Sequence, residues 1–301
     1  MKKYDYVFAR DVATQLMTKM EAARNGDSFL CDDGIGFNIL NKMTSGLLNG
    51  GLIVVGGRPS MGKTSFVLNI ARNLSVHTEK TVIFFSVELT KEQLVSRILQ
   101  SEARISSINL RSGKLDDEEY IRLNSCINKL KDSKLIIDDT PGISVDAIYE
   151  RALRIRETEN IDLIIIDYLQ LLSGPDDYKS RQEEMEYIVR KLKEMAKELG
   201  IPVMVTSQLS RAVEKREDHH PVLSDFRESI IEQDADTVIF IYREDYYKKD
   251  TKYHGLAEIS VSKHRNGGHG FVYMMWDPDH LNFTEYDGKY FPDISFIASY
   301  T

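Results

Sequence analysis

The sequence has few cysteines and no long apolar run. Cys31 and Cys126 are the only cysteines among 301 residues, so they offer neither a disulfide framework nor zinc-ligand spacing. This usage is typical of a reducing compartment, and the expected location is the cytoplasm. No apolar run approaches the roughly 18 residues that span a bilayer, and the N-terminus lacks the apolar stretch of a signal peptide. A membrane-spanning or disulfide-rich secreted protein is therefore not expected.

The sequence also lacks an excess of positive charge. Its formal net charge is −8 at pH 7, which argues against indiscriminate adhesion to nucleic acid. Specific binding of nucleic acid stays open, because a groove or a ring needs only a local basic lining. The charged and apolar fractions are those of an ordinary globular protein, large enough for one big domain or two small ones.

One loop carries the clearest chemical signal in the chain. Its residues fit the phosphate-binding pattern of a glycine, four residues, then Gly-Lys-Thr: Gly57, Arg58, Pro59, Ser60, Met61, Gly62, Lys63 and Thr64. A strand is expected before it, at 52–55, and a helix after it, at 65–71, so backbone N–H groups can surround phosphates at a helix N-terminus. Lys63 would reach the β- and γ-phosphates of a nucleoside triphosphate, and the Thr64 hydroxyl would ligate Mg²⁺. The alternative is a glycine-rich turn that matches by chance, and both flanks argue against it.

Strand-like and helix-like segments alternate after this loop. Strand-like runs cover residues 81–87, 135–138, 161–166 and 203–206, and helical patterns fall at 91–102, 117–130, 144–158 and 183–199. The alternation predicts an α/β domain around a mostly parallel sheet. Later runs, at 237–242, 256–262 and 271–276, are strand-like with no helix between them. They predict antiparallel strands that extend the sheet.

The N-terminal part is expected to be separate from this domain. Residues Ala9–Arg24 have a helical pattern with an apolar stripe that includes Leu16, Met17 and Met20, and the pair Asn25-Gly26 provides the stop. The predicted division is a helix and connector at 1–30 and one α/β domain at 31–301. The apolar stripe can pack on its own domain or on a neighbouring subunit, and the pattern favours neither.

Three polar residues that end predicted strands are candidates for a role beside the phosphate loop. Asp167 stands where an aspartate of P-loop enzymes holds Mg²⁺, and a polar cap on any buried strand is the alternative. Glu88 could orient an attacking water, but a helix expected from Thr90 makes a helix-start acid slightly the better interpretation. Gln208 could contact a γ-phosphate and sense its loss, since a carboxamide both donates and accepts, or it could be an ordinary strand end.

A basic turn lies between two of the later strands. Lys263 and Arg265 precede Asn266-Gly267, which is a strong hairpin signal. Such cations could stabilise phosphoryl transfer in a neighbour's site, in the manner of an arginine finger. Without further information, a soluble basic turn is the better interpretation.

Two further segments could bind the backbone of a nucleic acid, and they cover residues 179–193 and 211–227. The candidates in them are Arg181, Arg190, Arg211 and Arg227. Acidic residues are interleaved in both segments, so a solvated face is the simpler interpretation. Neither segment has the aromatic side chains of a base-stacking platform, and binding there would be salt-sensitive and largely independent of sequence.

Taken together, these motifs resemble the C-terminal ATPase domain of the DnaB-type replicative DNA helicases. Beside the phosphate loop, the resemblance rests on Asp167-Tyr168-Leu169-Gln170, Ser207-Gln208-Leu209-Ser210-Arg211, Ile231-Glu232-Gln233-Asp234-Ala235-Asp236 and Lys263-His264-Arg265-Asn266-Gly267. It covers nearly everything from about Gly36 to Trp276. It implies a RecA-like P-loop NTPase fold, a hexameric ring with ATP and Mg²⁺ between subunits, and movement along single-stranded DNA.

The resemblance also implies roles for single residues. Lys63 and Thr64 match the family's phosphate and magnesium ligands, and Asp167 matches its metal-side aspartate. Glu88 matches the catalytic carboxylate, and Gln208 matches the γ-phosphate sensor. Lys263 and Arg265 match the basic pair that the adjacent subunit supplies. The loop at 225–232, with Arg227 and Glu228, matches the loop that faces the channel and offers backbone amides to DNA phosphates. The N-terminal helix resembles the family's linker helix, which packs on the next subunit.

The sequence departs from the family pattern at two points. The family normally carries a helical domain before the linker helix, for which this chain has no room, so we expect either a fragment or a naturally short form. After Ser229 the family usually has a glycine, and this chain is one residue shorter there. The β-branched Ile230 cannot easily adopt conformations reserved for glycine, which predicts altered or weakened contact with DNA.

The function predicted on these grounds is a DNA-translocating ATPase of the replicative helicase class. It would form a hexamer on single-stranded DNA, with a primase or a helicase loader as possible partners. The alternative is a RecA-like ATP switch that assembles on a partner protein and unwinds nothing. A small-molecule kinase shares the phosphate loop, but the basic hairpin and the acidic segment 232–236 have no evident role in one.

Overall fold

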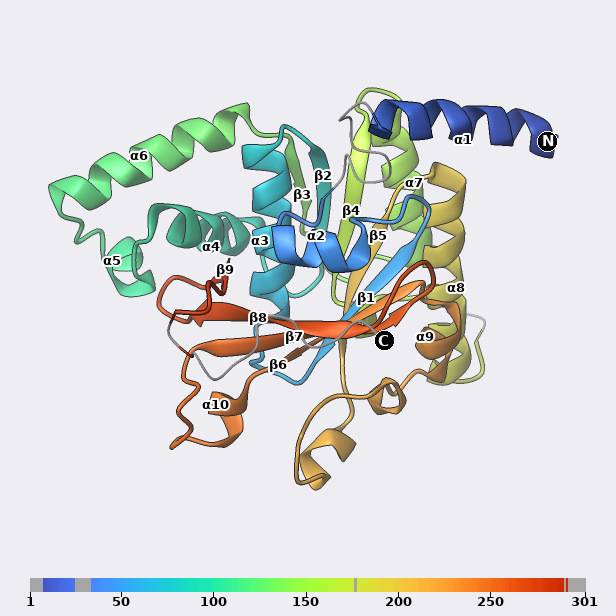
Figure 1. The fold of residues 1–301 in the computed structure, drawn as a ribbon. Helices are drawn as coiled ribbons and strands as arrows, with labels where there is room; N and C mark the ends of the chain where they lie inside the picture. The colour runs from blue at the N-terminus through green and yellow to red at the C-terminus, as the bar shows by residue number, and fades with distance from the viewer. Residues whose placement is uncertain (1–7, 25–33, 176–177, 290, 292–301) are drawn as a thin grey trace.

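The computed structural model describes residues 8–24, 34–175, 178–289 and 291. Within them, a nine-stranded sheet has the spatial order β3-β2-β4-β5-β1-β6-β7-β8-β9 (Figure 1). The strands are β1 (Leu52–Gly57), β2 (Thr81–Ser86), β3 (Leu135–Asp138), β4 (Ile161–Asp167), β5 (Val203–Gln208), β6 (Thr237–Tyr242), β7 (Leu256–His264), β8 (Gly270–Asp277) and β9 (Asn282–Glu285). Pairing is parallel from β3 to β6 and antiparallel from β6 to β9. The predicted α/β class with a mostly parallel sheet and an antiparallel extension is confirmed.

Helices cover both faces of the sheet (Figure 1). They are α1 (Ala9–Arg24), α2 (Asn38–Thr44), α3 (Lys63–His77), α4 (Lys91–Ala103), α5 (Ser107–Ser112), α6 (Asp117–Asp132), α7 (Val145–Arg156), α8 (Arg181–Leu199), α9 (Ser229–Asp234) and α10 (Glu244–Tyr247), with 3-10 turns η1 (Leu169–Leu171), η2 (Arg211–Lys215) and η3 (Leu223–Asp225). One core cluster joins the sheet to α7, α8 and α9, and the other joins it to α2, α3 and α4.

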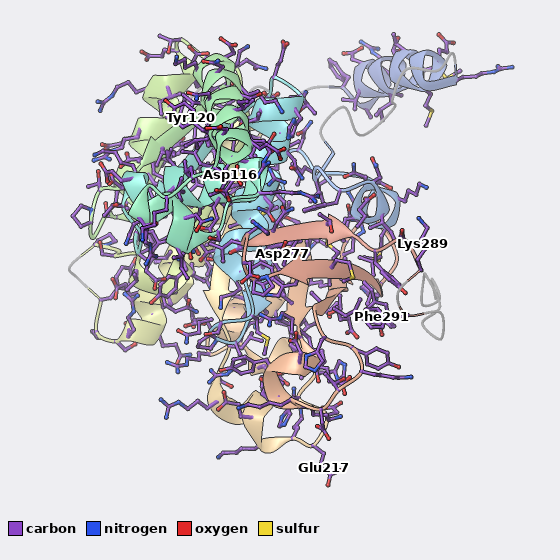
Figure 2. All side chains as sticks on the ribbon, turned by 90° about the vertical axis from the view of Figure 1, so that its left-hand side faces the viewer. Asp116, Tyr120, Glu217, Asp277, Lys289 and Phe291 are labelled. Atoms are coloured by element: carbon purple, nitrogen blue, oxygen red, sulfur yellow. The ribbon has the colours of Figure 1, made fainter. Side chains whose placement is uncertain are left out.

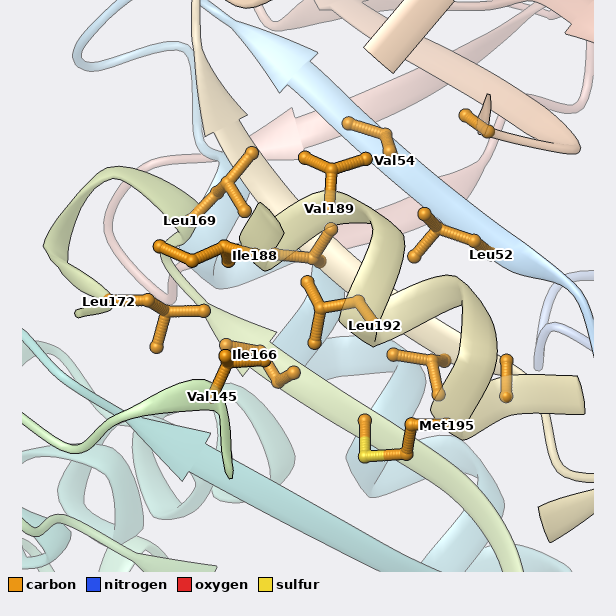
Figure 3. Packing of buried hydrophobic residues seen from close by; sticks show 14 of the residues in the cluster. Leu52, Val54, Val145, Ile166, Leu169, Leu172, Ile188, Val189, Leu192 and Met195 are labelled. Atoms are coloured by element: carbon orange, nitrogen blue, oxygen red, sulfur yellow. The ribbon is translucent and has the colours of Figure 1, made fainter. Parts of the chain in front are cut away.

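The central strand β1 contributes to the clusters on both faces of the sheet through its alternating side chains. Leu52 and Val54 belong to the cluster that packs against α8, shown in Figure 3, whereas Ile53 and Val55 belong to the cluster on the opposite face. All four are buried because helices cover both sides of a parallel sheet. The strand therefore reads as a continuous apolar run, and its burial fixes the position of the loop that follows it.

The structure corrects the predicted C-terminal part of the sheet. β6 pairs in parallel with β1, so the antiparallel extension begins only at β7. The chain reaches β6 through η2, η3 and α9, a long crossover that lets it enter the sheet in the same direction as β1. The short helix α10 separates β6 from β7, where no helix was predicted. The sequence analysis also did not predict α2, α5, α9 or β9.

The predicted N-terminal helix is present as α1 and lies outside the layers of the sheet and its covering helices (Figures 1 and 2). Leu16, Met17 and Met20 are about half exposed, at 45%, 57% and 53%. Every side chain of α1 that the structure describes is exposed. The apolar stripe is thus not covered by its own domain, in contrast to the first of the two predicted arrangements.

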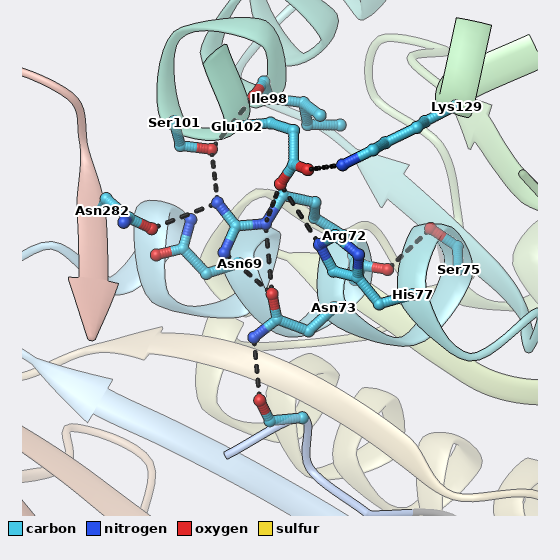
Figure 4. A network of polar contacts seen from close by, with 12 residues as sticks. Asn69, Arg72, Asn73, Ser75, His77, Ile98, Ser101, Glu102, Lys129 and Asn282 are labelled. Carbon is cyan, nitrogen blue, oxygen red and sulfur yellow. Dashed lines mark hydrogen bonds and ion pairs between the residues drawn. The ribbon is translucent and has the colours of Figure 1, made fainter. Parts of the chain in front are cut away.

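A buried arginine ties α3 to its neighbours (Figure 4). Arg72 on α3 donates from Nη1 to Ser101 Oγ of α4 at 2.8 Å and to Asn282 Oδ1 of β9 at 3.1 Å. Its Nε lies 3.5 Å from the carboxylate of Glu102. Burial lowers the pKa of Arg72 and the charge of Glu102 opposes that shift. The network fixes α3, whose first residue is Lys63.

The helices α5 and α6 project from the sheet edge and carry exposed apolar side chains. Asp116 caps α6 by accepting a hydrogen bond from Glu119 N at 2.7 Å, and both Asp116 and Tyr120 are labelled in Figure 2. Tyr120 and Ile121 are 60% and 68% exposed.

Among the residues that the structure describes, no helix has the length and apolarity to cross a membrane.

Candidate functional site

The predicted phosphate loop joins β1 to α3, as expected from its flanks. Its backbone turns through two left-handed residues, Ser60 with φ 66° and Gly62 with φ 98°. A Cβ atom on Gly62 would lie 2.9 Å from the ring of Phe283, so there is no space for a side chain here. The positive φ of this residue also favours glycine over any other residue type. The loop can therefore direct backbone N–H groups toward a ligand at the N-terminus of α3.

Lys63 is the only basic side chain in the first turn of α3 and is largely buried. Its ammonium donates to the carbonyl oxygens of Gly57 and Arg58 at 2.9 and 3.1 Å. Burial lowers the pKa of Lys63 to about 8, although the charges of Asp167 and Glu88 act in the opposite direction. An anionic ligand would stabilise the charged form of this ammonium, which burial disfavours.

The predicted loop residues divide into two groups. Pro59, Ser60, Gly62, Lys63 and Thr64 line a cavity of about 450 Å³, a volume suited to a small-molecule ligand. Gly57, Arg58 and Met61 were predicted to bind the nucleotide as well, but they do not belong to the lining.

Two arginines anchor the loop from outside the cavity. The buried Arg58 donates to the Leu209 carbonyl at 2.8 Å and pairs with Glu214 at 2.6 Å, so its guanidinium binds the segment after β5. Arg243 donates to the Ser60 carbonyl at 3.2 Å. Both contacts hold the loop backbone in place and leave its centre open to a ligand.

Thr64 and Asp167 are brought together as predicted. Thr64 Oγ1 donates to Asp167 Oδ2 at 2.7 Å, and Thr206 of β5 donates to the other carboxylate oxygen. Asp167 ends β4 and is 1% exposed. A hydroxyl beside a carboxylate suits a hard cation such as Mg²⁺. The described residues contain no group of three or more His, Cys, Asp or Glu side chains that could hold a metal, so such an ion would need ligand oxygens or water as well.

Glu88 lines the same cavity, and the structure removes the alternative interpretation for it. Helix α4 begins at Lys91 and is capped by Thr90, which accepts from Gln93 N at 3.4 Å, so Glu88 lies outside the helix. The turn that carries Glu88 is closed by a hydrogen bond from Ser86 Oγ to the Leu89 carbonyl at 2.6 Å. Its carboxylate is exposed and belongs to the cavity lining.

Gln208 also lines the cavity, from the strand beside β1. It pairs with Gly57 in the parallel register of β5 and β1, so the end of β5 lies beside the start of the phosphate loop. Ser86 and Asp167 are paired in the same way across β2 and β4. The carboxyl ends of four adjacent parallel strands thus place these polar groups at one edge of the sheet.

The basic hairpin forms as predicted, but its cations do not line this cavity. Lys263 Nζ donates to the carbonyls of Glu232 and Gln233 at 2.6 and 3.1 Å, and Arg265 donates to the Gln233 carbonyl at 2.8 Å. Arg265 also lies 3.6 Å from Asp236. Both cations therefore bind the C-terminal end of α9 in their own chain.

A second cavity, of about 380 Å³, contains three of the five residues predicted to bind DNA. Its lining consists of Gln170, Arg181, Gln182, Met185, Glu186, Arg227, Glu228, Ser229 and Ile230. Arg190 is not part of it and lies 3.6 Å from Glu186. Arg211 is exposed at the start of η2 and does not line it either. The structure thus gathers Arg181, Arg227 and Glu228 and leaves the other two predicted residues apart.

Comparison with known proteins agrees with this geometry. Residues 34–285 match the model of the DnaB-like helicase C terminal domain. The chain belongs to this family. It is 41% identical over 283 residues to the replicative DNA helicase DnaB of Geobacillus stearothermophilus, and 42% identical over 283 residues to the replicative DNA helicase DnaC of Bacillus subtilis. In each case the alignment covers 93% of this chain and 62% of the relative, so the chain spans less than two thirds of their length.

Solved structures have the same fold as this DnaB-like domain. One of them, an isolated ATPase domain, superposes with a TM-score of 0.86 at 31% identity, covering 94% of this chain and all of that domain. A DnaB-like replicative helicase, whose structure was described together with its interactions with primase, superposes with a TM-score of 0.83 at 31% identity. That match covers 95% of this chain and 69% of the other.

Some residues of the first cavity were missed by the sequence analysis of this DnaB-like domain. They are Ser65, Arg97, Tyr168, Trp276 and Leu281. Arg97 lies mid-helix in α4 and Leu281 just before β9, so nothing in their local pattern marks them. Tyr168 follows Asp167 directly, which could have identified it. Trp276 is 7% exposed, and its indole Nε1 has no hydrogen-bond partner in the described part of the chain.

The segment after Ser229, where a departure from the family pattern was predicted, is helical. Helix α9 starts at Ser229, and Ile230 and Ile231 are buried at 4% and 0% exposure. No residue from Arg227 to Ile231 has a positive φ. Ile230 therefore fits without backbone strain and contributes to the core. The altered contact with DNA stays a prediction.

Proposed function

We propose that this chain is the motor part of a ring-shaped replicative DNA helicase, which hydrolyses ATP and uses the energy to move on single-stranded DNA. In this proposal residues 1–30 are a linker helix and connector, and residues 31–301 are the RecA-like ATPase domain. The observation that carries the proposal is the first cavity, because it combines the phosphate loop, a Thr64–Asp167 pair and a free-standing carboxylate, Glu88.

In the proposed reaction each residue has a separate task. The phosphate loop and Lys63 bind the phosphates, and Thr64 and Asp167 hold Mg²⁺, which neutralises phosphate charge when it is bound. Glu88 orients the water that attacks the γ-phosphate, and Gln208 contacts that phosphate and registers its loss. Burial lowers the pKa of Arg97, which favours a phosphate as its partner over solvent.

The site needs a neighbouring subunit to be complete. Lys263 and Arg265 do not line the cavity of their own chain, yet a hairpin tip can reach an adjacent site. We therefore place them in the neighbour's nucleotide site within a homo-oligomer, a hexamer by likeness to the helicase family. The exposed stripe of α1 is the surface for packing on the next subunit. DNA, a primase and a helicase loader are the proposed partners.

Steady-state ATP hydrolysis with and without single-stranded DNA tests the proposal. We expect DNA to stimulate hydrolysis at low salt and the stimulation to fade as salt rises, because contacts with DNA phosphates release counterions. Arg227 and Arg181 at the second cavity are the cations expected to contribute. Hydrolysis that ignores DNA at every salt concentration would contradict the motor function and favour an ATP switch that acts on a partner protein.

Trp276 should report nucleotide binding directly. It is the single tryptophan of the chain, it lines the first cavity, and its indole N–H lacks a partner among the described residues. We expect a saturable change in tryptophan fluorescence when ATP and Mg²⁺ are added, because the ligand changes the surroundings of the indole. Lys63→Met should remove the change at the same ATP concentration. An unchanged spectrum in the wild type, with binding seen by calorimetry, would mean that the nucleotide lies away from Trp276.

The affinity for nucleotide should fall as the pH rises above about 8. Burial holds the pKa of Lys63 at about 8, so the ammonium is charged below that pH and loses its proton above it, while the phosphates stay ionised. Binding above this pH must then include uptake of a proton, and the affinity should drop by up to about tenfold per pH unit. Titrations followed by tryptophan fluorescence would measure this. Lys63→Arg should bind more weakly but without the pH dependence, because a guanidinium stays charged.

A further inference from the structure

The side-chain amide of Gln170 lies between the two cavities. Its Oε1 accepts a hydrogen bond from Gln208 N at 3.1 Å, and its Nε2 donates to Ser207 Oγ at 2.9 Å. The same Nε2 donates to Glu228 Oε2 at 3.2 Å. One amide thus binds the end of β5 with one side and the segment before α9 with the other.

The groups at the two ends of this amide belong to different sites. The Gln208 side chain lines the first cavity, with the phosphate loop, whereas Glu228 lines the second, with Arg227 and Arg181. Glu228 is half-buried, and burial raises its pKa while the hydrogen bond from Gln170 acts against that shift. In the described part of the chain, Gln170 is the side chain that donates to this carboxylate.

The backbone that carries Gln170 is itself held in place. Arg181 donates from Nη2 to the carbonyls of Gln170 and Leu172 at 2.8 and 3.1 Å, and Leu169 packs in the core with 0% exposure. A shift of the β5 end therefore cannot be absorbed by a free movement of η1. It has to move the amide of Gln170 or break its hydrogen bonds.

We propose that Gln170 is a positioning residue that couples the nucleotide cavity to the DNA-facing cavity. When the contact between Gln208 and the γ-phosphate is made or lost, the end of β5 moves, and Gln170 transmits the movement to Glu228 and to the adjacent Arg227. The residue touches neither phosphate nor the reacting water. This inference rests on the proposed function, since it assigns nucleotide to the first cavity and DNA to the second.

Gln170→Met tests the coupling, because methionine keeps the length of the side chain and removes both its donor and its acceptor. We expect DNA-free hydrolysis near the wild-type rate and loss of at least about fivefold in DNA stimulation. The ratio of DNA affinities measured with ADP and with a non-hydrolysable ATP analogue should move toward one. Gln182→Met is the matched control: it removes an amide that lines the same cavity but donates to Glu186 of its own helix α8. Any change in DNA affinity should then be equal with both nucleotides, so the ratio should stay at the wild-type value.

A double-mutant cycle with Glu228→Gln separates this role from a purely structural one. If Gln170 acts through Glu228, the effects of the two changes on the affinity ratio should not add. Additive effects, or a wild-type ratio in Gln170→Met, would overturn the inference while the proposed function stands. Loss of DNA-free hydrolysis in a folded Gln170→Met protein would also overturn it. If DNA neither stimulates hydrolysis by the wild type nor binds it with an affinity that depends on the nucleotide, both the proposed function and this inference are wrong.

Discussion

Glu88→Gln is expected to lower the rate of ATP hydrolysis by about a thousandfold while leaving ATP binding intact. Glutamine keeps the size and the exposed position of the side chain but cannot accept the proton of the attacking water. The phosphate loop, Lys63 and the Thr64–Asp167 pair are untouched by the change. Single-turnover hydrolysis measures the chemical step, and tryptophan fluorescence measures binding in the same protein.

Glu92→Gln is the matched control for this change. Glu92 lies in the first turn of α4, four residues beyond Glu88, and it is not part of the cavity lining. The same chemical replacement should therefore leave hydrolysis near the wild-type rate. Equal activity of Glu88→Gln and Glu92→Gln would show that another group activates the water.

Arg265→Ala is expected to abolish most hydrolysis, by about a thousandfold, although Arg265 does not line the cavity of its own chain. The reason is that its guanidinium would stabilise the phosphoryl group in the neighbour's site. To reach that site its side chain must leave the Gln233 carbonyl, an exposed contact at 2.8 Å, and the Asp236 carboxylate, which lies 3.6 Å away. Nucleotide binding by isolated subunits should survive.

Mixing two inactive variants distinguishes action on the neighbour from action within one chain. In mixed oligomers of Arg265→Ala and Glu88→Gln, some interfaces combine an intact Glu88 with an intact Arg265 from the adjacent subunit. Hydrolysis should reappear on mixing and depend on the ratio of the two proteins. If mixing restores nothing although mixed oligomers form, Arg265 serves its own chain, for instance by holding the end of α9.

Asp236, in the acidic segment before β6, binds three separate parts of the fold. It is 3% exposed, accepts from Leu52 N at 2.7 Å and also binds Lys193 of α8. Arg265 N donates to its carbonyl oxygen at 2.9 Å. One residue thus joins the first residue of the phosphate-loop strand, a core helix and the basic hairpin.

Local patterns in the sequence determined much of this protein. The phosphate loop, the acid at the end of β4 and the helix Ala9–Arg24 were predicted at the positions where the structure has them. The reason is that each depends on a short-range rule: glycine for a left-handed turn, an apolar run for a doubly covered strand, and a helical period for an amphipathic stripe. Because an apolar run stops at a polar residue, the sequence also predicted that Asp167 and Gln208 end their strands.

Contacts between distant segments were decided only by the tertiary structure. The direction of β6 follows from a long crossover, and the position of Trp276 in the first cavity follows from the register of β8 and β9, where it pairs with Phe283. Spacing alone favoured a helix-start role for Glu88, until the cap at Thr90 left its carboxylate free in the cavity. The bridge from Gln208 through Gln170 to Glu228 joins three segments whose order in space no local pattern records. Whether two side chains form a hydrogen bond depends on their distance and orientation. Between segments far apart in the sequence, the packing of the sheet sets both of these.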